Sequence, residues 1–257
     1  MSNVVITGAS SGIGAALARH YARQRARLLL IGRDEARLSA IAAACAGEAA
    51  LVETARVDVR ERAAMQAVLS DFDDRHPLDI AVANAGVTNI LAPDAAVEPA
   101  AEAERVLATN LIGAFNTMAP AAERMAARGA GRIGLVGSIA GLRGLPYSPA
   151  YSASKAGLKA LGDAMRGKLR RHGVSVTVAS IGFVATPLDE GIASPKPFRM
   201  SAERAAARIA SAVDAGRAHV AFPLPLAAGA RLLALLPPRL GDALLRRIAV
   251  SARKNDE

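Results

Sequence analysis

The chain has 257 residues, of which 52% are hydrophobic and 21% charged, a composition typical of a globular protein that excludes a disordered one. The formal net charge of +9 comes mostly from arginines spread over helical patterns without interleaved aromatic residues, so we predict no nucleic-acid partner. The single cysteine, Cys45, excludes an internal disulfide framework and a thiolate metal cluster, and it predicts a reducing compartment.

Short apolar runs alternate along the chain with longer Ala-rich helical patterns. The apolar runs predict β-strands over 3–8, 26–32, 49–59, 78–86, 131–138, 173–182 and 219–223. The other patterns predict helices over 12–24, 34–46, 60–76, 102–129, from about 151 onward, and over 201–216. Nearly continuous apolar strands are expected where a parallel sheet is covered on both faces. We therefore predict an α/β fold with one doubly wound parallel sheet and helices on both faces.

The sequence "TGASSGIG", Thr7 to Gly14, falls between the first strand and the first helix. A helix N-terminus there offers free backbone N–H groups and a positive dipole end to a pyrophosphate. Gly8, Gly12 and Gly14 permit a tight turn and close backbone approach. The alternative is a turn without a ligand, but three glycines before a good helix are unfavourable unless they serve a purpose. We interpret the segment as the dinucleotide turn of a Rossmann-type domain.

Further motifs follow in order: "VDV" at 57–59, "NAG" at 84–86, "TNLIG" at 109–113, "GSIAG" at 137–141 and "YSASK" at 151–155. Together with the glycine turn they resemble the classical short-chain dehydrogenase/reductase family over residues 3 to about 190. The resemblance implies a catalytic tetrad of Asn110, Ser138, Tyr151 and Lys155. It also implies a nicotinamide cofactor held by Gly8, Ser10, Ser11, Gly12, Ile13, Gly14, Arg33, Asp58, Val59, Asn84, Ala85, Gly86, Tyr151, Lys155, Val184 and Thr186. One departure is Ile181, which stands where the family usually has proline.

The end of the second strand, "LLLIGRDEARL", bears on the choice of cofactor. An acid there would accept hydrogen bonds from the ribose 2′-hydroxyl and repel a 2′-phosphate. Gly32 occupies that position and Arg33 follows it, and a guanidinium can make a paired, charge-assisted contact with a phosphate. Arg33 as a solvated loop charge is the alternative, which the neighbouring Asp34 and Glu35 support unless these acids instead cap the next helix. We predict NADP(H).

Tyr151 and Lys155 are four residues apart, so on a helix they share a face. An ammonium near a phenol favours the phenolate, and we expect it to lower the pKa of Tyr151 toward neutral pH. By the resemblance, Tyr151 exchanges a proton with the substrate oxygen, Ser138 hydrogen-bonds that oxygen, and Lys155 also holds the nicotinamide ribose. Asn110 would bind a water that relays protons to Lys155. The four histidines share no metal-ligand spacing, so we predict no metal.

The substrate is expected between the segments 141–149 and 187–200, the second of which we interpret as a mobile lid because it is rich in Pro, Gly and Ser. The candidate substrate contacts are Ser138, Leu145, Tyr147 and Phe183, with further apolar candidates at Leu142, Leu188, Ile192, Phe198 and Met200. Arg143 and Arg199 are either contacts for an anionic head group or solvated charges.

The predicted catalytic domain covers 1–222, and 223–257 forms a C-terminal apolar and basic helical extension of it. Leu240, Leu244, Leu245 and Ile248 fall on one helical face surrounded by arginines. Such a helix lies on an anionic bilayer surface, or it packs on its own domain or on a partner subunit. The N-terminus lacks the pattern of a secretory signal and no apolar run is long enough to span a bilayer, so we expect a cytoplasmic protein with this membrane contact left open.

These observations favour an NADP(H)-dependent oxidoreductase that interconverts a ketone and a secondary alcohol. Its substrate is expected to be hydrophobic or lipid-like, such as a 3-oxoacyl or sphingoid compound, and its assembly a homo-oligomer. The alternative is a binding protein that senses NADP on the same fold without catalysis. All four tetrad residues are present, which a sensor does not need.

Overall fold

In the computed structural model, residues 1–92, 95–190 and 195–245 are described. One sheet contains seven parallel strands in the order β3-β2-β1-β4-β5-β6-β9. Its strands are β1 Asn3–Thr7, β2 Arg27–Gly32, β3 Leu51–Arg56, β4 Ile80–Ala83, β5 Gly131–Ser138, β6 Val174–Ile181 and β9 His219–Phe222. Strand order reverses direction between β1 and β4, and this confirms the predicted doubly wound sheet.

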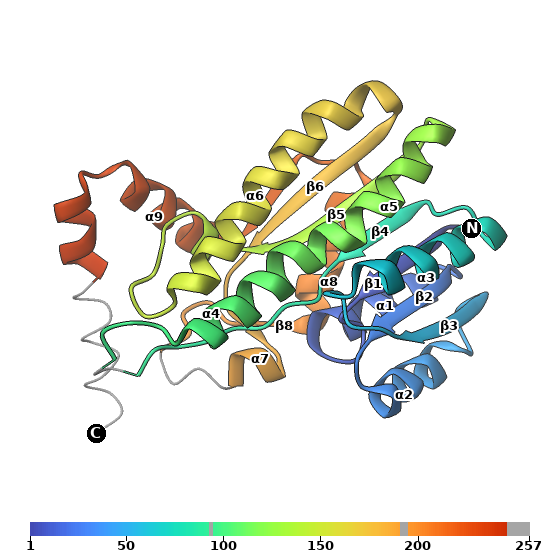
Figure 1. Ribbon diagram of the computed structural model, residues 1–257, viewed down its shortest axis with the longest axis horizontal. Coiled ribbons are helices and arrows are strands. Elements are labelled where there is room, and N and C mark those ends of the chain that lie inside the picture. The colour runs from blue at the N-terminus through green and yellow to red at the C-terminus, as the bar shows by residue number, and fades with distance from the viewer. Residues whose placement is uncertain (93–94, 191–194, 246–257) are drawn as a thin grey trace.

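Helices cover both faces of this sheet (Figure 1). They are α1 Gly12–Arg23, α2 Glu35–Cys45, α3 Arg62–Arg75, α4 Ala100–Leu107, α5 Gly113–Arg128, α6 Pro149–Leu169, α7 Pro187–Glu190, α8 Ala202–Asp214 and α9 Leu224–Leu235. A π-helical turn, Ala108–Ile112, joins α4 to α5, and a further helical segment covers 238–245. The short strands β7 Val184–Ala185 and β8 Met200–Ser201 pair with each other beside the main sheet.

The core forms two layers because alternate residues of each buried strand point to opposite faces of the sheet. Val4 and Ile6 of β1 pack in one layer with residues of α1, α2 and α8. Val5, between them in the sequence, packs in the other layer with residues of α3, α5 and α6. Ala, Leu, Val and Ile supply most of both layers, as expected from a chain with 3% aromatic residues.

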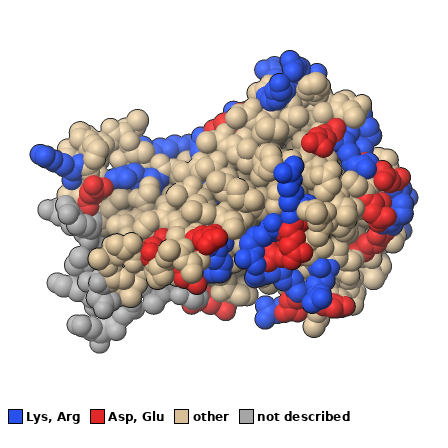
Figure 2. Space-filling model, in the orientation of Figure 1, with Lys and Arg blue, Asp and Glu red and all other residues tan. Residues whose placement is uncertain are grey.

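Charged residues of both signs are intermixed over much of the surface in Figure 2. Several arginines pair with acids there, for example Arg75 with Glu53 and Asp71. Within the described ranges, no helix combines the length and the apolar character needed to cross a bilayer.

Candidate active site

The turn between β1 and α1 depends on its three glycines. Gly8 and Gly12 have φ angles of +66° and +52°, which glycine adopts without strain. A Cβ at Gly14 would lie 2.1 Å from the carbonyl oxygen of Gly8, so only glycine allows α1 to start this close to the turn. The N-terminus of α1 has no side-chain cap and no acid in its first turn. Its N–H groups therefore remain available to an anion such as a pyrophosphate.

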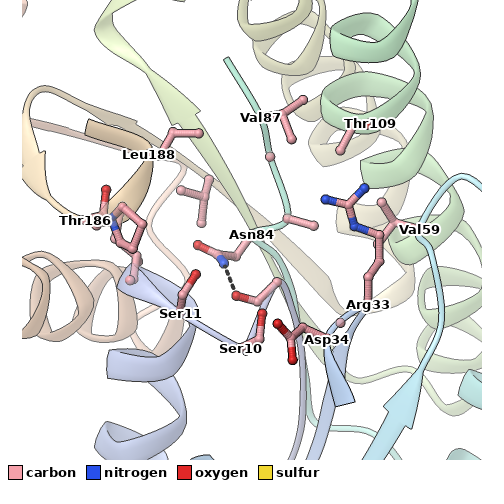
Figure 3. A pocket seen from close by; sticks show the side chains of 18 of the residues that line it. Ser10, Ser11, Arg33, Asp34, Val59, Asn84, Val87, Thr109, Thr186 and Leu188 are labelled. Carbon is pink, nitrogen blue, oxygen red and sulfur yellow. Dashed lines mark hydrogen bonds between the residues drawn. The ribbon is translucent and has the colours of Figure 1, made fainter. Parts of the chain in front are cut away.

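Thr7 and Asn84 hold this turn against the end of β4. The Asn84 side-chain amide donates to the carbonyl oxygens of Thr7 and Gly8, at 3.0 and 3.3 Å, and it points toward the turn in Figure 3. The Thr7 hydroxyl accepts from the N–H groups of Asn84 and Ala85, at 3.1 and 3.3 Å. Thr7 was not among the predicted site residues, although it begins the quoted glycine motif.

A cleft of about 360 Å³ lies at the carboxyl ends of the strands, where ligands bind in open α/β sheets. Most of the predicted cofactor residues line it: Gly8, Ser10, Ser11, Gly12, Ile13, Arg33, Asp58, Val59, Asn84, Ala85, Gly86, Tyr151, Lys155 and Thr186. Gly14 and Val184 do not line the cleft: Gly14 packs on the turn, and Val184 is buried. Further lining residues were not among the predicted cofactor residues: Gly32, Asp34, Arg37, Val57, Val87, Thr109, Val136, Gly137, Ile181, Pro187 and Leu188. Two of them are predicted from the sequence in other roles, Gly32 at the position that decides the cofactor and Leu188 as an apolar substrate contact.

Arg33 follows the last residue of β2 and lies at that end of the cleft, near Ser10 and Asp34 (Figure 3). Its side chain is 63% exposed, and its nearest carboxylate in the described ranges is Asp58, at 3.9 Å. Asp34 caps α2 by accepting from the Arg37 N–H at 3.0 Å, and its carboxylate also pairs with the Arg37 guanidinium. Asp34, the acid next to Arg33, is therefore bound to the first turn of α2. The guanidinium groups of Arg33 and Arg37 both belong to residues that line this end of the cleft.

Asp58 follows β3 and is held by Arg60. The Arg60 guanidinium and backbone N–H donate to the Asp58 carboxylate, with the shortest contact at 2.7 Å. These hydrogen bonds lower the pKa of Asp58. Asp58 is therefore a carboxylate at neutral pH, in the position from which the resemblance expects a contact to adenine.

Tyr151 lies in the first turns of α6, and Ser138 ends β5 beside it. Burial raises the pKa of Tyr151, while a hydrogen bond with the Ser138 side chain acts in the opposite direction. The Lys155 ammonium is 5.8 Å from the centre of the Tyr151 ring. The expectation that Lys155 lowers the pKa of Tyr151 is therefore wrong for this structure, because the desolvation of the phenolate is the larger effect.

Lys155 is buried, and this desolvation lowers its pKa to about 8. Its Nζ donates to the carbonyl oxygen of Val136 at 2.9 Å. A Cβ at Gly86 would meet the Asn110 Oδ1 at 3.3 Å and the Lys155 Nζ at 3.5 Å. These two side chains therefore converge on the backbone of Gly86, at the edge of the cleft.

Asn110 is fully buried and sits in the π-helical turn rather than in a regular helix. Its Oδ1 accepts from the Val87 N–H at 2.8 Å, and its Nδ2 donates to the Val87 carbonyl and to the Ser154 hydroxyl. Single π-turns inside helices often mark functional positions. Here the turn fixes Asn110 between the segment after β4 and the helix that carries Tyr151 and Lys155.

The predicted substrate residues are less closely grouped than the cofactor residues. Tyr147 and Phe183 are half-buried and do not line the cleft, and Leu145 lines a second cavity of about 630 Å³ between the 143–146 segment, α6 and residues 242–245. Leu188 does line the cleft, whereas Ile192 lies outside the described residues.

The two candidate arginines for an anionic head group both have partners within the protein. Arg143 pairs with Asp242 at 2.7 Å, and Arg199 pairs with the buried Asp189 at 2.7 Å. They therefore contribute to packing of the segments around the site. No cluster of three or more His, Cys, Asp or Glu side chains suited to a metal ion occurs in the ranges that the structure describes.

The parallel sheet, the glycine turn and the lined cleft define a protein of the Rossmann-type dinucleotide-binding class. The sequence matches the short chain dehydrogenase family over residues 2–197, and the chain belongs to this family.

Its relatives and structural neighbours agree with this assignment. An uncharacterized oxidoreductase of Myxococcus xanthus is 35% identical over 245 residues, with 95% of this chain and 96% of that protein covered. Ketoacyl reductase HetN of Nostoc sp. is 31% identical over 208 residues, with 79% of this chain and 72% of that protein covered. The crystal structure of levodione reductase superimposes with a TM-score of 0.80 at 26% identity, covering 88% of this chain and 98% of that one.

Proposed function

We propose that the protein is an NADP(H)-dependent reductase that interconverts a hydrophobic ketone and its secondary alcohol. The observation that carries this proposal is that Tyr151 and Lys155 both line the cleft that the glycine turn lines, with the Ser138 hydroxyl hydrogen-bonded to the Tyr151 phenol. A nicotinamide cofactor bound in the cleft would supply or accept the hydride.

Tyr151 acts as the acid in the reducing direction. Because burial raises its pKa, the phenol is protonated at neutral pH and can donate its proton to the substrate oxygen. Ser138 donates a hydrogen bond to the same oxygen as negative charge develops on it. In the oxidising direction Tyr151 would serve as the base.

Lys155 returns the proton to Tyr151, and Asn110 positions the backbone beside Lys155. With a pKa of about 8, Lys155 gains and loses a proton near neutral pH, which suits a relay. Asn110 is a positioning residue whose two hydrogen bonds to Val87 fix the backbone beside Lys155. By the family resemblance it also holds the relay water.

The preference for NADP(H) rests on charge at the end of β2. Gly32 leaves no carboxylate to repel a 2′-phosphate, and Arg33 and Arg37 both line that end of the cleft. Ser10 adds a hydroxyl donor. Asp34 is occupied with capping α2 and with Arg37.

The proposed substrate is hydrophobic or lipid-like, with a 3-oxoacyl or sphingoid compound as the nearest chemical class. The name of the Nostoc relative, a ketoacyl reductase, supports a 3-oxoacyl compound. The proposed setting is cytoplasmic, and the proposed assembly is a homo-oligomer. Leu107, Ile112 and Phe115 are exposed apolar residues on α4, α5 and the turn between them, which suits a subunit contact.

The proposal is tested by following NADPH and NADH oxidation with ketones of increasing chain length. We expect turnover to favour NADPH and longer chains, and Tyr151→Phe to lower kcat by at least about a hundredfold, since general acid catalysis contributes about 10²–10⁴-fold. Cofactor binding by Tyr151→Phe, measured by fluorescence titration, should stay within a fewfold of the original. Unchanged turnover in Tyr151→Phe would contradict the proposed role.

A further inference from the structure

The C-terminal extension, residues 223–245 as far as the structure describes it, is a helical hairpin with an apolar surface. It consists of α9 and the helical segment 238–245, which approach closely: a Cβ at Gly241 would lie 3.4 Å from the Leu233 carbonyl oxygen. Six leucines of the hairpin are exposed: Leu224, Leu232, Leu235, Leu236, Leu240 and Leu244. Leu235 is the most exposed of these, at 82%.

A different set of residues attaches the hairpin to the catalytic domain. Ala227 and Leu245 are buried, and the start of α9 reaches Gly182, where an added Cβ would lie 3.4 Å from Leu226. The Arg143–Asp242 ion pair ties the second helical segment to the loop after β5. The exposed leucines are therefore not the ones that fold the extension onto its domain.

This arrangement corrects the predicted apolar face of Leu240, Leu244, Leu245 and Ile248. Leu245 faces its own domain, whereas Leu240 and Leu244 are exposed, and Ile248 lies outside the described residues. The extension therefore packs on its own domain through some of its apolar residues and exposes others to solvent.

The leucines of α9 form a stripe. Leu224, Ala228, Leu232 and Leu235 are spaced by four, four and three residues, which places them along one side of the helix. Soluble monomers seldom expose a contiguous apolar patch of this kind, and such a patch commonly marks a contact surface.

The charges around the stripe indicate what covers it. Arg231 and Arg239 are exposed on the hairpin. In Figure 2 the end of the molecule that carries α9 shows mostly uncharged atoms, with blue groups and a red group beside them. From residue 223 to the chain end the sequence has six basic residues and three acidic ones, namely Arg231, Arg239, Arg246, Arg247, Arg253 and Lys254 against Asp242, Asp256 and Glu257. Apolar residues flanked by arginines fit the interface of a bilayer with anionic lipids.

We propose that the C-terminal hairpin docks this protein on an anionic membrane surface, with the leucines of α9 in the lipid interface. The hairpin begins where Leu226 and Ile139 meet Gly182, and Ile139 follows Ser138 in the chain. Docking would therefore hold the substrate side of the protein at the bilayer. The docking proposal rests on the proposed function and adds the source of the substrate: the ketone is a lipid taken from the membrane rather than from solution.

Vesicle co-sedimentation of the full chain tests the proposal, using phosphatidylglycerol mixed with phosphatidylcholine and phosphatidylcholine alone. Binding should require the anionic lipid and weaken as salt is raised. Leu232→Gln/Leu235→Gln should bind at least about tenfold more weakly, because two apolar side chains no longer enter the lipid. Arg239→Gln should bind about fivefold more weakly.

Val97→Gln is the matched control, since Val97 is exposed and apolar but lies outside the extension. It should bind vesicles as the original chain does. Turnover of a short water-soluble ketone, measured without vesicles, should be unchanged in every variant. Absent turnover together with normal vesicle binding would therefore contradict only the proposed function.

Three outcomes would overturn the docking proposal. The chain could fail to sediment with anionic vesicles, or Leu232→Gln/Leu235→Gln could bind as well as the original. Alternatively, the double substitution could lower the mass of the assembly in analytical ultracentrifugation without lipid, and the leucine stripe would then be a contact between copies of the chain. Equal binding to phosphatidylcholine alone would contradict the anionic preference.

Discussion

At the scale of single residues, the proposed preference for NADP(H) rests on the last residue of β2 and the one after it. Gly32 lines the end of the cleft, and a Cβ there would lie 3.3 Å from the Leu38 side chain and 3.5 Å from the Ser10 hydroxyl. Arg33 contributes an exposed positive charge to the same place. A negative group on the ribose is attracted by Arg33 and would be repelled by an acid at position 32.

We therefore expect Arg33→Gln to reduce the preference for NADPH over NADH about tenfold, the effect of losing one charge-assisted hydrogen bond. The measurement is the ratio of kcat/KM for the two cofactors. Arg56→Gln is the matched control, because Arg56 is an exposed arginine nearby that does not line the cleft. If both variants shift the ratio equally, general surface charge rather than Arg33 sets the preference.

Other residue-scale features depend on partners distant in the sequence. Arg143 pairs with Asp242, 99 residues away, and the Arg199 guanidinium pairs with Asp189, 10 residues away. The sequence leaves such arginines open as ligand contacts, because nothing local identifies the carboxylate that folding brings to them. The pKa of Tyr151 could not be predicted for a similar reason. The sequence shows the spacing of Tyr151 from Lys155, but it does not show the burial that has the larger effect on this pKa.

At the scale of elements, strands and capped helices could be predicted more reliably than irregular ones. β1, β2, β5 and β6 are continuous buried runs, and Asp34 and Ser201 cap α2 and α8 as their residue types suggest. Helix α9 falls in the extension predicted to be helical, but its bounds were not predicted because Pro225 makes the segment look broken, although proline is well tolerated in a first helical turn. The π-helical turn at Asn110 has no sequence pattern of its own, since it arises from packing between α4, α5 and α6.

The close packing of α1 on the glycine turn makes a prediction for Gly14→Ala. The new Cβ would collide with a backbone oxygen rather than a flexible side chain, so the turn must move. We expect a loss of about 1–3 kcal/mol in the free energy of unfolding and weaker cofactor binding. Urea unfolding and fluorescence titration measure these two effects.

Gly167→Ala is the matched control for this substitution. Gly167 is also within a helix, α6, but has nothing within 4 Å of an added Cβ. It should stabilise the protein by about 0.5–1 kcal/mol, the difference in helix propensity between alanine and glycine. A destabilised Gly167→Ala together with a neutral Gly14→Ala would refute this account of the turn.

At the scale of the whole molecule, Asp73 joins elements that are far apart in the chain. It is buried at the end of α3 and accepts from Arg128 of α5 at 2.7 and 2.8 Å, from Arg124 at 3.0 Å, and from the Leu78 N–H before β4 at 2.8 Å. Burial alone would raise the pKa of Asp73, but the hydrogen bonds from Arg128, Leu78 and Arg124 outweigh it and leave the pKa lowered. The folded state thus favours the ionised form.

Asp73→Asn should therefore lower the free energy of unfolding at pH 7 by about 2–4 kcal/mol, since it leaves two arginines without their buried partner. Because the folded-state pKa is depressed, the contribution of Asp73 is fully present above the unfolded-state pKa of about 3.9 and is lost as pH falls through the lower folded-state value. The difference between the original chain and Asp73→Asn should shrink below about pH 4.

Asp74→Asn, an exposed neighbour that shares Arg124, should change stability by less than about 1 kcal/mol. Urea unfolding across this pH range measures all three proteins, and a difference that stays constant down to acid pH would show that Asp73 acts through its shape rather than its charge.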